Sequence, residues 1–445
     1  MIPQTPMIVA PLDPDFRPAA LVNRAHRRLA RIPLIIGLER ESGLVSRYET
    51  VINPDEPDAL HYVERLVKFF LWARGGWKLY LGGPAPLLNR VAVQPFDAEL
   101  MSRVYERPFE VVVLRVEEVP VARERNTALG GHLDGCRIGF DLGASDYKVA
   151  AVQEGAVVYS DEFPWNPKDQ TDIQYHYDHI NRGLKKAAAH LPRVDAIGGS
   201  TAGVVVNNKI MVASLFRAVS AAKFNEAKNI FVRLRDEWRV PFEVANDGDV
   251  TALAGAMSLK VNGVLGIALG SSQAAGYLNS QGCMTGWLSE LAFAPVDYNP
   301  AAPPDEWSGD RGVGALYFSQ QAVNKLLPAA GITVPNDMSL PERLKEVQAL
   351  IAKGDQRAAK IYETIGVYLG YTIPHYADFY EFHHMLILGR VTTGEGGNIL
   401  LEKAREVLQA TFPAIAAIIA LHVPDEKSRR VGQAGAAASL PALQR

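Results

Sequence analysis

Residues 138–149 read Ile-Gly-Phe-Asp-Leu-Gly-Ala-Ser-Asp-Tyr-Lys-Val, and this stretch indicates the fold more directly than any other. Apolar residues on either side of a glycine turn predict two strands joined by a tight connection. Asp141 stands at the end of the first strand, and Gly143, Ala144 and Ser145 form the turn. Backbone N–H groups and a serine hydroxyl in such a turn can face phosphate oxygens, while the aspartate holds hydrated Mg²⁺. A plain β-hairpin, in which the glycine only permits positive φ, gives the same pattern.

A second small-residue turn, Gly270-Ser271-Ser272, follows the apolar run Val264–Leu269. Small side chains let the backbone approach an anion closely, and the two hydroxyls add donors. The alternative is a simple connection between two strands. Neither turn is specific by itself, and the Walker phosphate loop and the dinucleotide fingerprint are both absent from the chain.

A third group, Asn246-Asp247-Gly248-Asp249, lies between a predicted strand and a predicted helix. An asparagine can bind a hydroxyl as donor and as acceptor, and a carboxylate can accept a proton from one. The alternative is that Asp247 or Asp249 caps the helix. Both can hold, because one carboxylate can cap while the other faces a cleft.

A fourth loop runs from Gly389-Arg390 to Gly394 and precedes a helix predicted from Ile399 to Gln409. Glycines at a strand end leave room for a base and ribose to lie on the backbone. A flexible loop is the alternative.

Composition excludes several classes of protein. The chain has 445 residues, 48% hydrophobic and 21% charged, which predicts two or three globular domains. A net charge of −3 gives no reason to expect nucleic acid or an anionic membrane as partner. Cys136 and Cys283 have no metal-ligand spacing and suit a reducing cytoplasm. The proline-interrupted N-terminus does not resemble a signal peptide, and no apolar run is long enough to span a membrane.

Three zones are expected along the chain. Residues 1–130 predict a small α+β module of unknown role, with a helix over Pro57–Arg74 and a linker over Val121–Gly135. Residues 131–250 and 251–445 alternate strands and helices, which predicts α/β units with parallel strands. We expect them to form a smaller and a larger lobe, with a C-terminal helix that can return to the smaller one. The helices expected there cover Asp172–His190, Ser214–Trp238, Pro341–Lys353 and Gln356–Tyr371.

Taken in order and spacing, these segments resemble the ROK family (repressors, open reading frames and kinases) from about Arg137 to Leu440. The matching segments are Asp141–Ser145, Ser200-Thr201-Ala202-Gly203, Asn246–Asp249, Gly270–Ser272, Ser289-Glu290, Ser308-Gly309 and Tyr368-Leu369-Gly370. The resemblance implies a two-lobed, ribonuclease H-like fold of the actin-like ATPase type. It also implies a sugar kinase that uses ATP and Mg²⁺, in the cytoplasm and as a homodimer, with no nucleic acid and no membrane as partner.

The resemblance also assigns roles to residues. Asp247 is implied as the general base on the acceptor hydroxyl, while Asn246, Glu290, Ser200, Thr201 and Gly203 bind the sugar. Asp141 assists Mg²⁺ through water. The nucleotide and its phosphates are implied at Asp141, Gly143, Ala144, Ser145, Gly270, Ser271, Ser272, Gly389, Arg390 and Gly394.

The chain departs from the family pattern in three respects. Glu290 is followed by Leu291-Ala292-Phe293, where the family often has a histidine that contacts the sugar and, in many members, zinc. The family's cysteine-rich zinc motif is missing, so no structural zinc is predicted. Arg390 stands where a glycine is usual at the adenosine site.

Rival interpretations follow from the same residues. His176 and His179 have the spacing of two metal ligands, but an exposed helix face is the preferred interpretation, and His383-His384 are interpreted as structural. A DNA-binding repressor of the same family is disfavoured because residues 1–130 contain one strong helix and only a short basic run, Arg24–Arg31. A catalytically silent sugar or nucleotide sensor remains the alternative to the kinase. An actin-like or chaperone-like ATPase would not need the Asn246–Asp249 motif.

Overall fold

The computed structural model describes residues 5–125, 129–423 and 426–443. The chain divides into two compact units: the first comprises Met1–Arg125, Ile267–Ala275 and Trp287–Val423, and the second Asn126–Gly266, Gly276–Gly286 and Pro424–Arg445. The N-terminal segment therefore shares a unit with most of the predicted larger lobe, and the C-terminal residues belong with the predicted smaller lobe. Two predictions concern residues outside the described part of the chain: residues 1–4, in the stretch predicted not to be a signal peptide, and residues 126–128, in the predicted linker.

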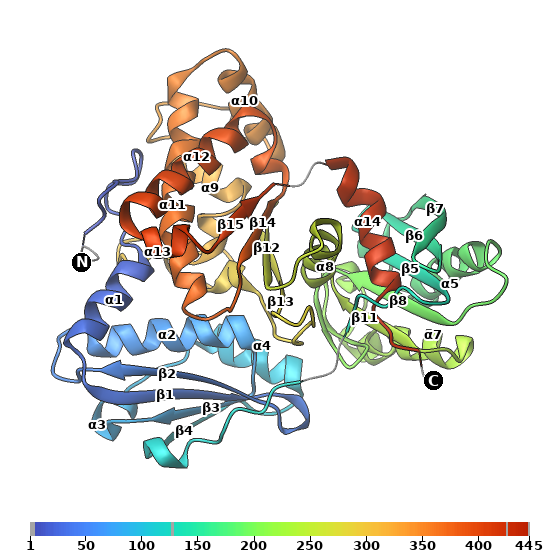
Figure 1. The fold of residues 1–445 in the computed structure, drawn as a ribbon, viewed down its shortest axis with the longest axis horizontal. Helices are drawn as coiled ribbons and strands as arrows, with labels where there is room; N and C mark the ends of the chain where they lie inside the picture. The colour runs from blue at the N-terminus through green and yellow to red at the C-terminus, as the bar shows by residue number, and fades with distance from the viewer. Residues whose placement is uncertain (1–4, 126–128, 424–425, 444–445) are drawn as a thin grey trace. The chain divides into compact units, whose positions relative to one another are not determined.

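The N-terminal segment is built on a four-stranded sheet of order β2-β1-β3-β4 (Figure 1). Its strands are β1 (Ile32–Glu39), β2 (Val45–Ile52), β3 (Lys78–Gly82) and β4 (Glu110–Leu114). Strand β1 is antiparallel to β2 and β3, and β4 is parallel to β3. The helices are α1 (Ala19–Leu29), α2 (Ala59–Arg74), α3 (Ala85–Leu88) and α4 (Pro95–Tyr105). The segment is α+β as predicted, but its sequence pattern indicated one strong helix where the structure has several.

Helix α2 is buried on nearly all sides, since 13 of its 16 residues are buried. A helix that is apolar beyond one face needs covering on more than one side. It lies against the sheet, and its other side packs on the rest of the first unit (Figure 1). There the Phe69 ring lies 4.2 Å from the Phe379 ring and 4.3 Å from that of His375. The predicted helix over Pro57–Arg74 is confirmed, and its aromatic residues are core residues.

A second sheet, of order β13-β12-β14-β15, supports the remainder of the first unit. Its strands are β12 (Val264–Leu269), β13 (Gln273–Leu278), β14 (His384–Leu388) and β15 (Ala420–His422). Of the β12–β13 hairpin, only Ile267–Ala275 belongs to this unit, namely the end of β12, the turn and the start of β13. The helices are α9 (Gln320–Leu326), α10 (Leu340–Ala352), α11 (Gln356–Ala377), α12 (Gly394–Thr411) and α13 (Pro413–Ala416). The helices predicted over Pro341–Lys353 and Gln356–Tyr371 correspond to α10 and α11.

The second unit contains a five-stranded sheet of order β11-β8-β5-β6-β7. Its strands are β5 (Cys136–Leu142), β6 (Asp146–Gln153), β7 (Ala156–Pro164), β8 (Ala196–Thr201) and β11 (Phe242–Asn246), and a small ribbon is formed by β9 (Val204–Val206) and β10 (Lys209–Val212). Strands β5, β6 and β7 are antiparallel neighbours, whereas β8 is parallel to β5 and β11 is parallel to β8. The carboxyl ends of β5, β8 and β11 therefore meet at one edge of the sheet.

Helices α5 (Ile173–Ala188), α7 (Ile230–Trp238), α8 (Asp247–Leu259) and α14 (Glu426–Ala438) cover this sheet. Helix α14 packs directly on the strands because two of their positions have no side chain. A Cβ atom on Gly139 or Gly198 would stand 1.7 Å from the carbonyl oxygen of Ala434 or Ala437. This contact brings the C-terminal helix onto β5 and β8.

The predicted continuous helix over Ser214–Trp238 is wrong. The structure has two 3-10 turns, Ser214–Phe216 and Ala221–Lys223, followed by α6 (Phe224–Lys228) and α7. Leu215 and Phe216 turn into the core, and Ser220 is extended with ψ of 151°, which a continuous helix does not allow. Across the described ranges, no helix combines the length and the hydropathy needed to cross a membrane.

Candidate active site

Three parallel strands of the second unit end in polar residues at one edge of the sheet. Asp141 on β5 lies opposite Ser200 on β8, and Asn246 on β11 lies opposite Thr201. In open α/β sheets, ligands bind outside the carboxyl ends of parallel strands. This edge is therefore the candidate active site of the second unit, and three separately predicted motifs contribute to it.

Asp141 lies deepest at this edge, with 8% of its surface exposed. Ser200 Oγ donates a hydrogen bond of 2.7 Å to its Oδ1. Burial raises the pKa of Asp141 to about 6; the Ser200 hydrogen bond and the charge of Lys148 oppose this rise, and Asp247 adds to it. A carboxylate whose charge is disfavoured by burial is stabilised by a cation beside it.

Asn246 links the start of α8 to the turn after β8. Its Oδ1 accepts from Gly248 N at 2.8 Å, and its Nδ2 donates to Gly203 O at 2.8 Å. The N-cap of α8 is thus Asn246, and the interpretation that Asp247 or Asp249 caps this helix is wrong. Gly203 has φ of 100°, and a Cβ atom there would lie 2.2 Å from a backbone oxygen, so only glycine fits.

The two aspartates of the first turn of α8 have different surroundings. Asp249 Oδ1 accepts from Tyr277 N at 3.1 Å, and burial raises the pKa of Asp249 to about 7 against that hydrogen bond. Burial also raises the pKa of Asp247, where the backbone N–H groups of Gly248 and of Asp247 itself act in the opposite direction. Among the described residues, no side chain bonds to the Asp247 carboxylate. Asp247 is therefore the carboxylate available to a ligand.

The Gly143–Ser145 turn is closed by bonds of its own. Gly143 N donates to Asp146 O at 2.9 Å, and Trp165 Nε1 donates to Gly143 O at 2.8 Å. Ser145 Oγ donates to Asp146 Oδ2 at 3.1 Å, while Lys148 Nζ lies 3.0 Å from Asp146 Oδ1. The two residues after the glycine are exposed. The turn therefore joins two strands of a β-hairpin, the alternative considered from the sequence. Lys148 offsets the negative charge of Asp146 in this turn.

Gln433 on α14 also bonds to residues of this edge. Its Nε2 donates to Ser200 Oγ at 3.3 Å and to the backbone oxygen of Asp247 at 3.4 Å. Nothing in the local sequence around Gln433 indicates this contact, because α14 reaches β8 only through the tertiary fold.

In the first unit, the Gly270 turn and the Gly389 loop pack against each other. Gly389 has φ of 102°, and a Cβ atom there would lie 2.3 Å from Leu269 O. The turn is anchored to the start of α9, because Gly270 O accepts from Gln320 N at 2.9 Å and Ser271 O accepts from Gln321 Nε2 at 3.4 Å. Gly270 N donates to the backbone oxygen of Ser272 at 3.0 Å.

Arg390 and Gly394 lie at the start of α12. The backbone oxygen of Arg390 accepts from Gln348 Nε2 at 3.0 Å, and Gly394 is the first helical residue, with φ of 71° and open space where a Cβ would stand. The helix predicted from Ile399 therefore begins earlier than expected. Unpaired N–H groups at a helix start favour anions.

The predicted site residues thus form two sets, one in each unit. The second unit holds Asp141, Gly143, Ala144, Ser145, Ser200, Thr201, Gly203, Asn246 and Asp247, whereas the first holds Gly270, Ser271, Ser272, Glu290, Gly389, Arg390 and Gly394. In the second unit Asp141, Ser200 and Asn246 come together, and in the first unit the Gly270 turn meets the Gly389 loop. The Glu290 backbone is instead bonded to Trp72.

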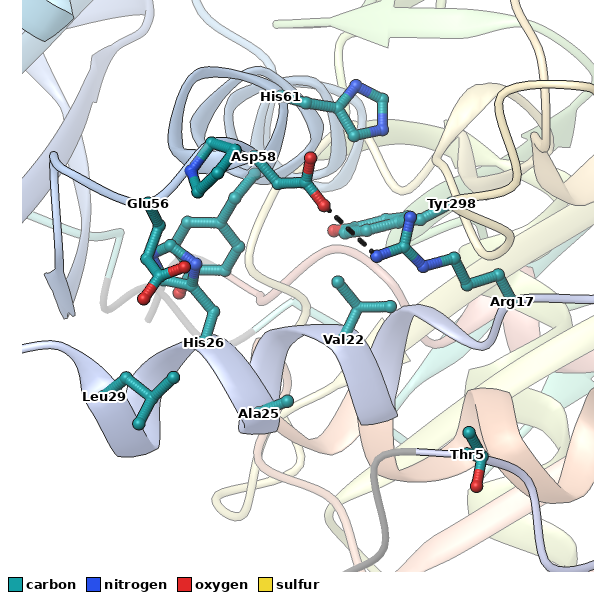
Figure 2. A pocket seen from close by; sticks show the side chains of 12 residues that line it. Thr5, Arg17, Val22, Ala25, His26, Leu29, Glu56, Asp58, His61 and Tyr298 are labelled. Carbon is teal, nitrogen blue, oxygen red and sulfur yellow. Dashed lines mark hydrogen bonds and ion pairs between the residues drawn. The ribbon is translucent and has the colours of Figure 1, made fainter.

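A cavity of about 530 Å³ in the first unit lies apart from every predicted site residue (Figure 2). It opens between α1 and the start of α2, where the His26 ring is stacked at 3.9 Å on Tyr62. Arg17 and Asp58 pair with each other at 3.4 Å beside Tyr298, and both are largely exposed. Burial lowers the pKa of His26. Arg17 and Asp58, two charged residues beside this cavity, therefore pair with each other within the protein.

Two of the histidines named in the sequence, His176 and His384, have polar partners inside the protein. His176 is fully buried, with Nε2 2.9 Å from Pro167 O, so the interpretation as part of an exposed helix face is wrong for this residue. His384 Nδ1 lies 3.1 Å from His422 Nε2. The described part of the chain contains no group of three or more His, Cys, Asp or Glu placed to hold a metal ion.

Comparison with solved structures identifies the fold. The ROK hexokinase from Thermus thermophilus matches with a TM-score of 0.55 at 17% identity, over 68% of this chain and 97% of the hexokinase. A ROK family transcriptional regulator, a homologue of the E. coli MLC protein, matches with a TM-score of 0.56 at 19% identity, over 73% and 82%. The chain has the ROK fold.

A ROK family protein from Streptococcus pneumoniae TIGR4, solved with sucrose, also matches, with a TM-score of 0.50 at 11% identity over 67% of this chain and 96% of that protein. The two-lobed α/β fold expected from the sequence is thereby confirmed. No protein-family model matches the chain, and no curated protein matches it significantly. These ROK structures include a kinase and a regulator, so the fold alone does not decide between the two activities.

Proposed function

We propose that the chain belongs to the ROK family as a sugar kinase, which transfers the γ-phosphate of ATP to a hydroxyl of a hexose or hexose derivative. The observation that carries this proposal is the Asp247 carboxylate. It stands at the carboxyl edge of the second unit's sheet, has a raised pKa and bonds only to backbone N–H groups among the described residues. A base in this state can accept the proton of an acceptor hydroxyl.

The remaining residues of the edge have roles consistent with phosphoryl transfer, which depends on positioning and charge neutralisation more than on covalent chemistry. Asn246 holds the start of α8 and thereby the backbone of Asp247. Ser200, Thr201 and Gly203 form the adjoining turn, where we place sugar contacts. Gln433 braces Ser200 and Asp247 from α14.

Asp141 is the residue that would hold Mg²⁺ through water. It fits this task because its carboxylate is buried, has a pKa raised to about 6 and is near the exposed Gly143–Ser145 turn. Mg²⁺ bound with ATP supplies charge neutralisation on the phosphates. The turns at Gly143, Gly270, Gly389 and Gly394 are the proposed nucleotide contacts.

A coupled assay of nucleotide consumption tests the proposal. Hexoses, amino sugars and their N-acetyl forms are offered as acceptors, with ATP, other nucleoside triphosphates and polyphosphate as donors. We expect acceptor-dependent turnover with at least one pair. Absence of turnover with every pair, while sugar binding is measurable by calorimetry, would overturn the kinase.

A catalytically silent sugar or nucleotide sensor is the second candidate, and one observation favours it. Phe293, at the position of a frequent family histidine, packs on Trp72 with 4.4 Å between ring centroids and offers no hydrogen bond to a sugar. The DNA-binding version of the sensor is less favoured, because Arg24 and Arg27 of the basic run on α1 are paired with Asp378 at 2.9 and 2.8 Å.

A further inference from the structure

The backbone around Glu290 is held by the last turn of α2. The N–H groups of Leu288, Ser289 and Glu290 donate, in that order, to the carbonyl oxygens of Arg74, Ala73 and Trp72 at 3.2, 3.1 and 3.0 Å. The last four carbonyls of a helix have no partner inside it. The fourth, that of Leu71, accepts from Gly75 N at 2.7 Å. The end of α2 is thus satisfied mainly by the Glu290 loop, defined here as Leu288–Phe293.

The conformation of this loop is one that needs support. Ser289 has φ of 49°, which is uncommon for a residue other than glycine and costs free energy unless its surroundings impose it. Just before the loop, the Arg74 guanidinium lies 3.4 Å from the centre of the Trp287 ring. A stacked arginine at the end of α2 therefore adds a side-chain contact to the backbone bonds.

A second contact lies at the other end of the loop. The Phe293 ring packs on two aromatic rings of the N-terminal segment, with centroid distances of 4.4 Å to Trp72 and 5.5 Å to Phe96. Trp72 is itself fixed, because its Nε1 donates to Asp97 Oδ1 at 3.1 Å. The side chain that replaces the frequent family histidine is thus an anchor on α2 and α4.

A third contact joins the chain after the loop to the same face of α2. Arg65 and Lys68 both pair with Asp310, with Arg65 Nη1 at 3.1 Å and Lys68 Nζ at 3.1 Å. Lys68 also lies 2.9 Å from Asp97, and all four side chains are buried. Burial alone would raise the pKa of Asp310, but Arg65 and Lys68 hold it below its ordinary value. The two cations and two carboxylates balance, as buried charges must.

A structural metal does not fit this region. Between Glu290 and Asp310 the chain has no cysteine and no histidine, and the described residues supply no metal-binding cluster there. Hydrogen bonds, aromatic packing and ion pairs from the N-terminal segment are what order it.

We propose that α2 of the N-terminal segment is a positioning element of the acceptor site, which holds the Glu290 loop and so places Glu290 for the sugar. This inference rests on the proposed function, since the sugar contact of Glu290 is part of that proposal. It assigns a role to part of residues 1–125, the segment for which the sequence predicts no role. The Phe96–Phe293 contact is the place to test it, because both rings are only partly buried.

Hydrogen exchange measures directly how firmly the Glu290 loop is bonded to the end of α2. In the full chain, the amides of Leu288–Glu290 should exchange slowly, because each is bonded to a carbonyl of α2. Phe96→Ala and Phe293→Ala should each speed their exchange by about 3- to 10-fold, the range expected for the loss of aromatic contacts of this kind. Phe109→Ala is the matched control, because Phe109 is a partly buried residue of the same segment whose ring has no ring contact to the loop among the described residues. Phe293→Ala carries the test alone should Phe96→Ala fail to fold. Phe96→Leu, which keeps an apolar side chain at this position, should retain most of the protection and serves as the conservative comparison.

Kinetics separate positioning from a general loss of structure. Phe96→Ala and Phe293→Ala should raise the KM of the sugar by a similar factor and leave the KM of the nucleotide unchanged, and the double variant should show less than the sum of both effects. Unchanged exchange in folded Phe96 and Phe293 variants, or equal changes in sugar and nucleotide KM, would overturn the positioning role. A wild-type protein without any turnover would contradict the proposed function instead, and hydrogen exchange then decides alone whether α2 holds the loop.

Discussion

Ser200 Oγ donates a 2.7 Å hydrogen bond to Asp141 Oδ1 from the neighbouring strand, and both side chains are buried. Register places them opposite each other on β5 and β8, which are parallel. One hydroxyl donor does not offset the burial of this carboxylate, so the pKa of Asp141 stays raised. A cation beside it would stabilise its charged form. This pair ties the first predicted phosphate motif to the predicted sugar turn.

Asp247→Asn should lower turnover by about 10²–10⁴-fold and leave nucleotide affinity unchanged, because a general base of this kind contributes that factor. The start of α8 should survive, since Asn246 and not Asp247 provides its cap. Steady-state kinetics and nucleotide titration check this. Asp178→Asn, at an exposed position on α5, is the matched control and should behave like wild type. Undiminished activity of Asp247→Asn would contradict the assignment.

Ser200→Ala should move the acidic limb of the activity profile to higher pH. The Ser200 hydrogen bond lowers the pKa of Asp141, so its removal raises that pKa above the present value of about 6. If the charged form of Asp141 is needed, activity is lost as pH falls through this pKa. Profiles of kcat/KM against pH measure the shift, with the exposed Ser160→Ala on β7 as control. Superimposable profiles for both variants would exclude a role for Asp141 charge.

Asp249→Asn should make the protein more stable at neutral and alkaline pH. The pKa of Asp249 is raised by burial to about 7, so the folded state binds more protons than the unfolded state between the unfolded pKa of about 3.9 and 7. The free energy of unfolding of the wild type therefore falls as pH rises through that window. The amide removes this dependence and keeps the oxygen that accepts from Tyr277 N.

Urea titrations at several pH values show whether the difference in unfolding free energy between Asp249→Asn and wild type grows from pH 4 to 7. Asp236→Asn, at an exposed position on α7, should show no such growth. Parallel curves for Asp249→Asn and wild type would contradict a raised pKa of Asp249.

Gly198→Ala should weaken the attachment of α14, whereas Gly432→Ala should not. A Cβ at Gly198 would stand 1.7 Å from Ala437 O, but one at Gly432 meets nothing within 4 Å. Overpacking of this kind costs about 1–3 kcal/mol, and glycine to alanine in an open helical position gains up to about 1 kcal/mol. Denaturation and limited proteolysis of the C-terminus compare the two. Equal stability of both variants would contradict direct packing of α14 on β8.

Lys68→Met should destabilise the first unit by about 3–5 kcal/mol, because it leaves the buried Asp97 without its cation and leaves Asp310 with Arg65 alone. Asp97 and Asp310 are both bonded to Lys68 and both buried. Lys78→Met is the control, since Lys78 pairs with the partly exposed Glu110 at 2.9 Å. Thermal unfolding should show a loss for the first variant only, and an equal loss in both would argue against the buried cluster.

Much of the fold followed from the amino-acid pattern. The strand over Val264–Leu269 and the helices that became α2, α10 and α11 carry strong periodicity or clear turn residues at their ends. Residues 214–238 were predicted wrongly because Leu215 and Phe216 fit a helical pattern, although they turn into the core as a 3-10 segment. Local helix propensity does not indicate that these two side chains pack into the core at this point of the chain.

The candidate site was predictable only in part. Asp141, Asn246 and Asp247 were marked by residue type and by their position at strand ends. Their division of labour was not, because the N-cap role of Asn246 and the Tyr277 N–H that binds Asp249 are matters of geometry. The sequence did not indicate Gln433 as a site residue, because a single glutamine on an alanine-rich helix is typical of an exposed surface. Its contact with the site exists only because α14 packs on β8.

The sequence by itself determined where backbone can turn tightly and where acid and hydroxyl groups follow a strand, because these properties belong to single residues and their neighbours. The tertiary structure alone decided which of these groups meet: the parallel pairing of β5, β8 and β11 brings Asp141, Ser200 and Asn246 to one edge. It also decided that the end of α2 holds the Glu290 loop, because the carbonyls left free at a helix terminus take whichever donors the fold brings to them.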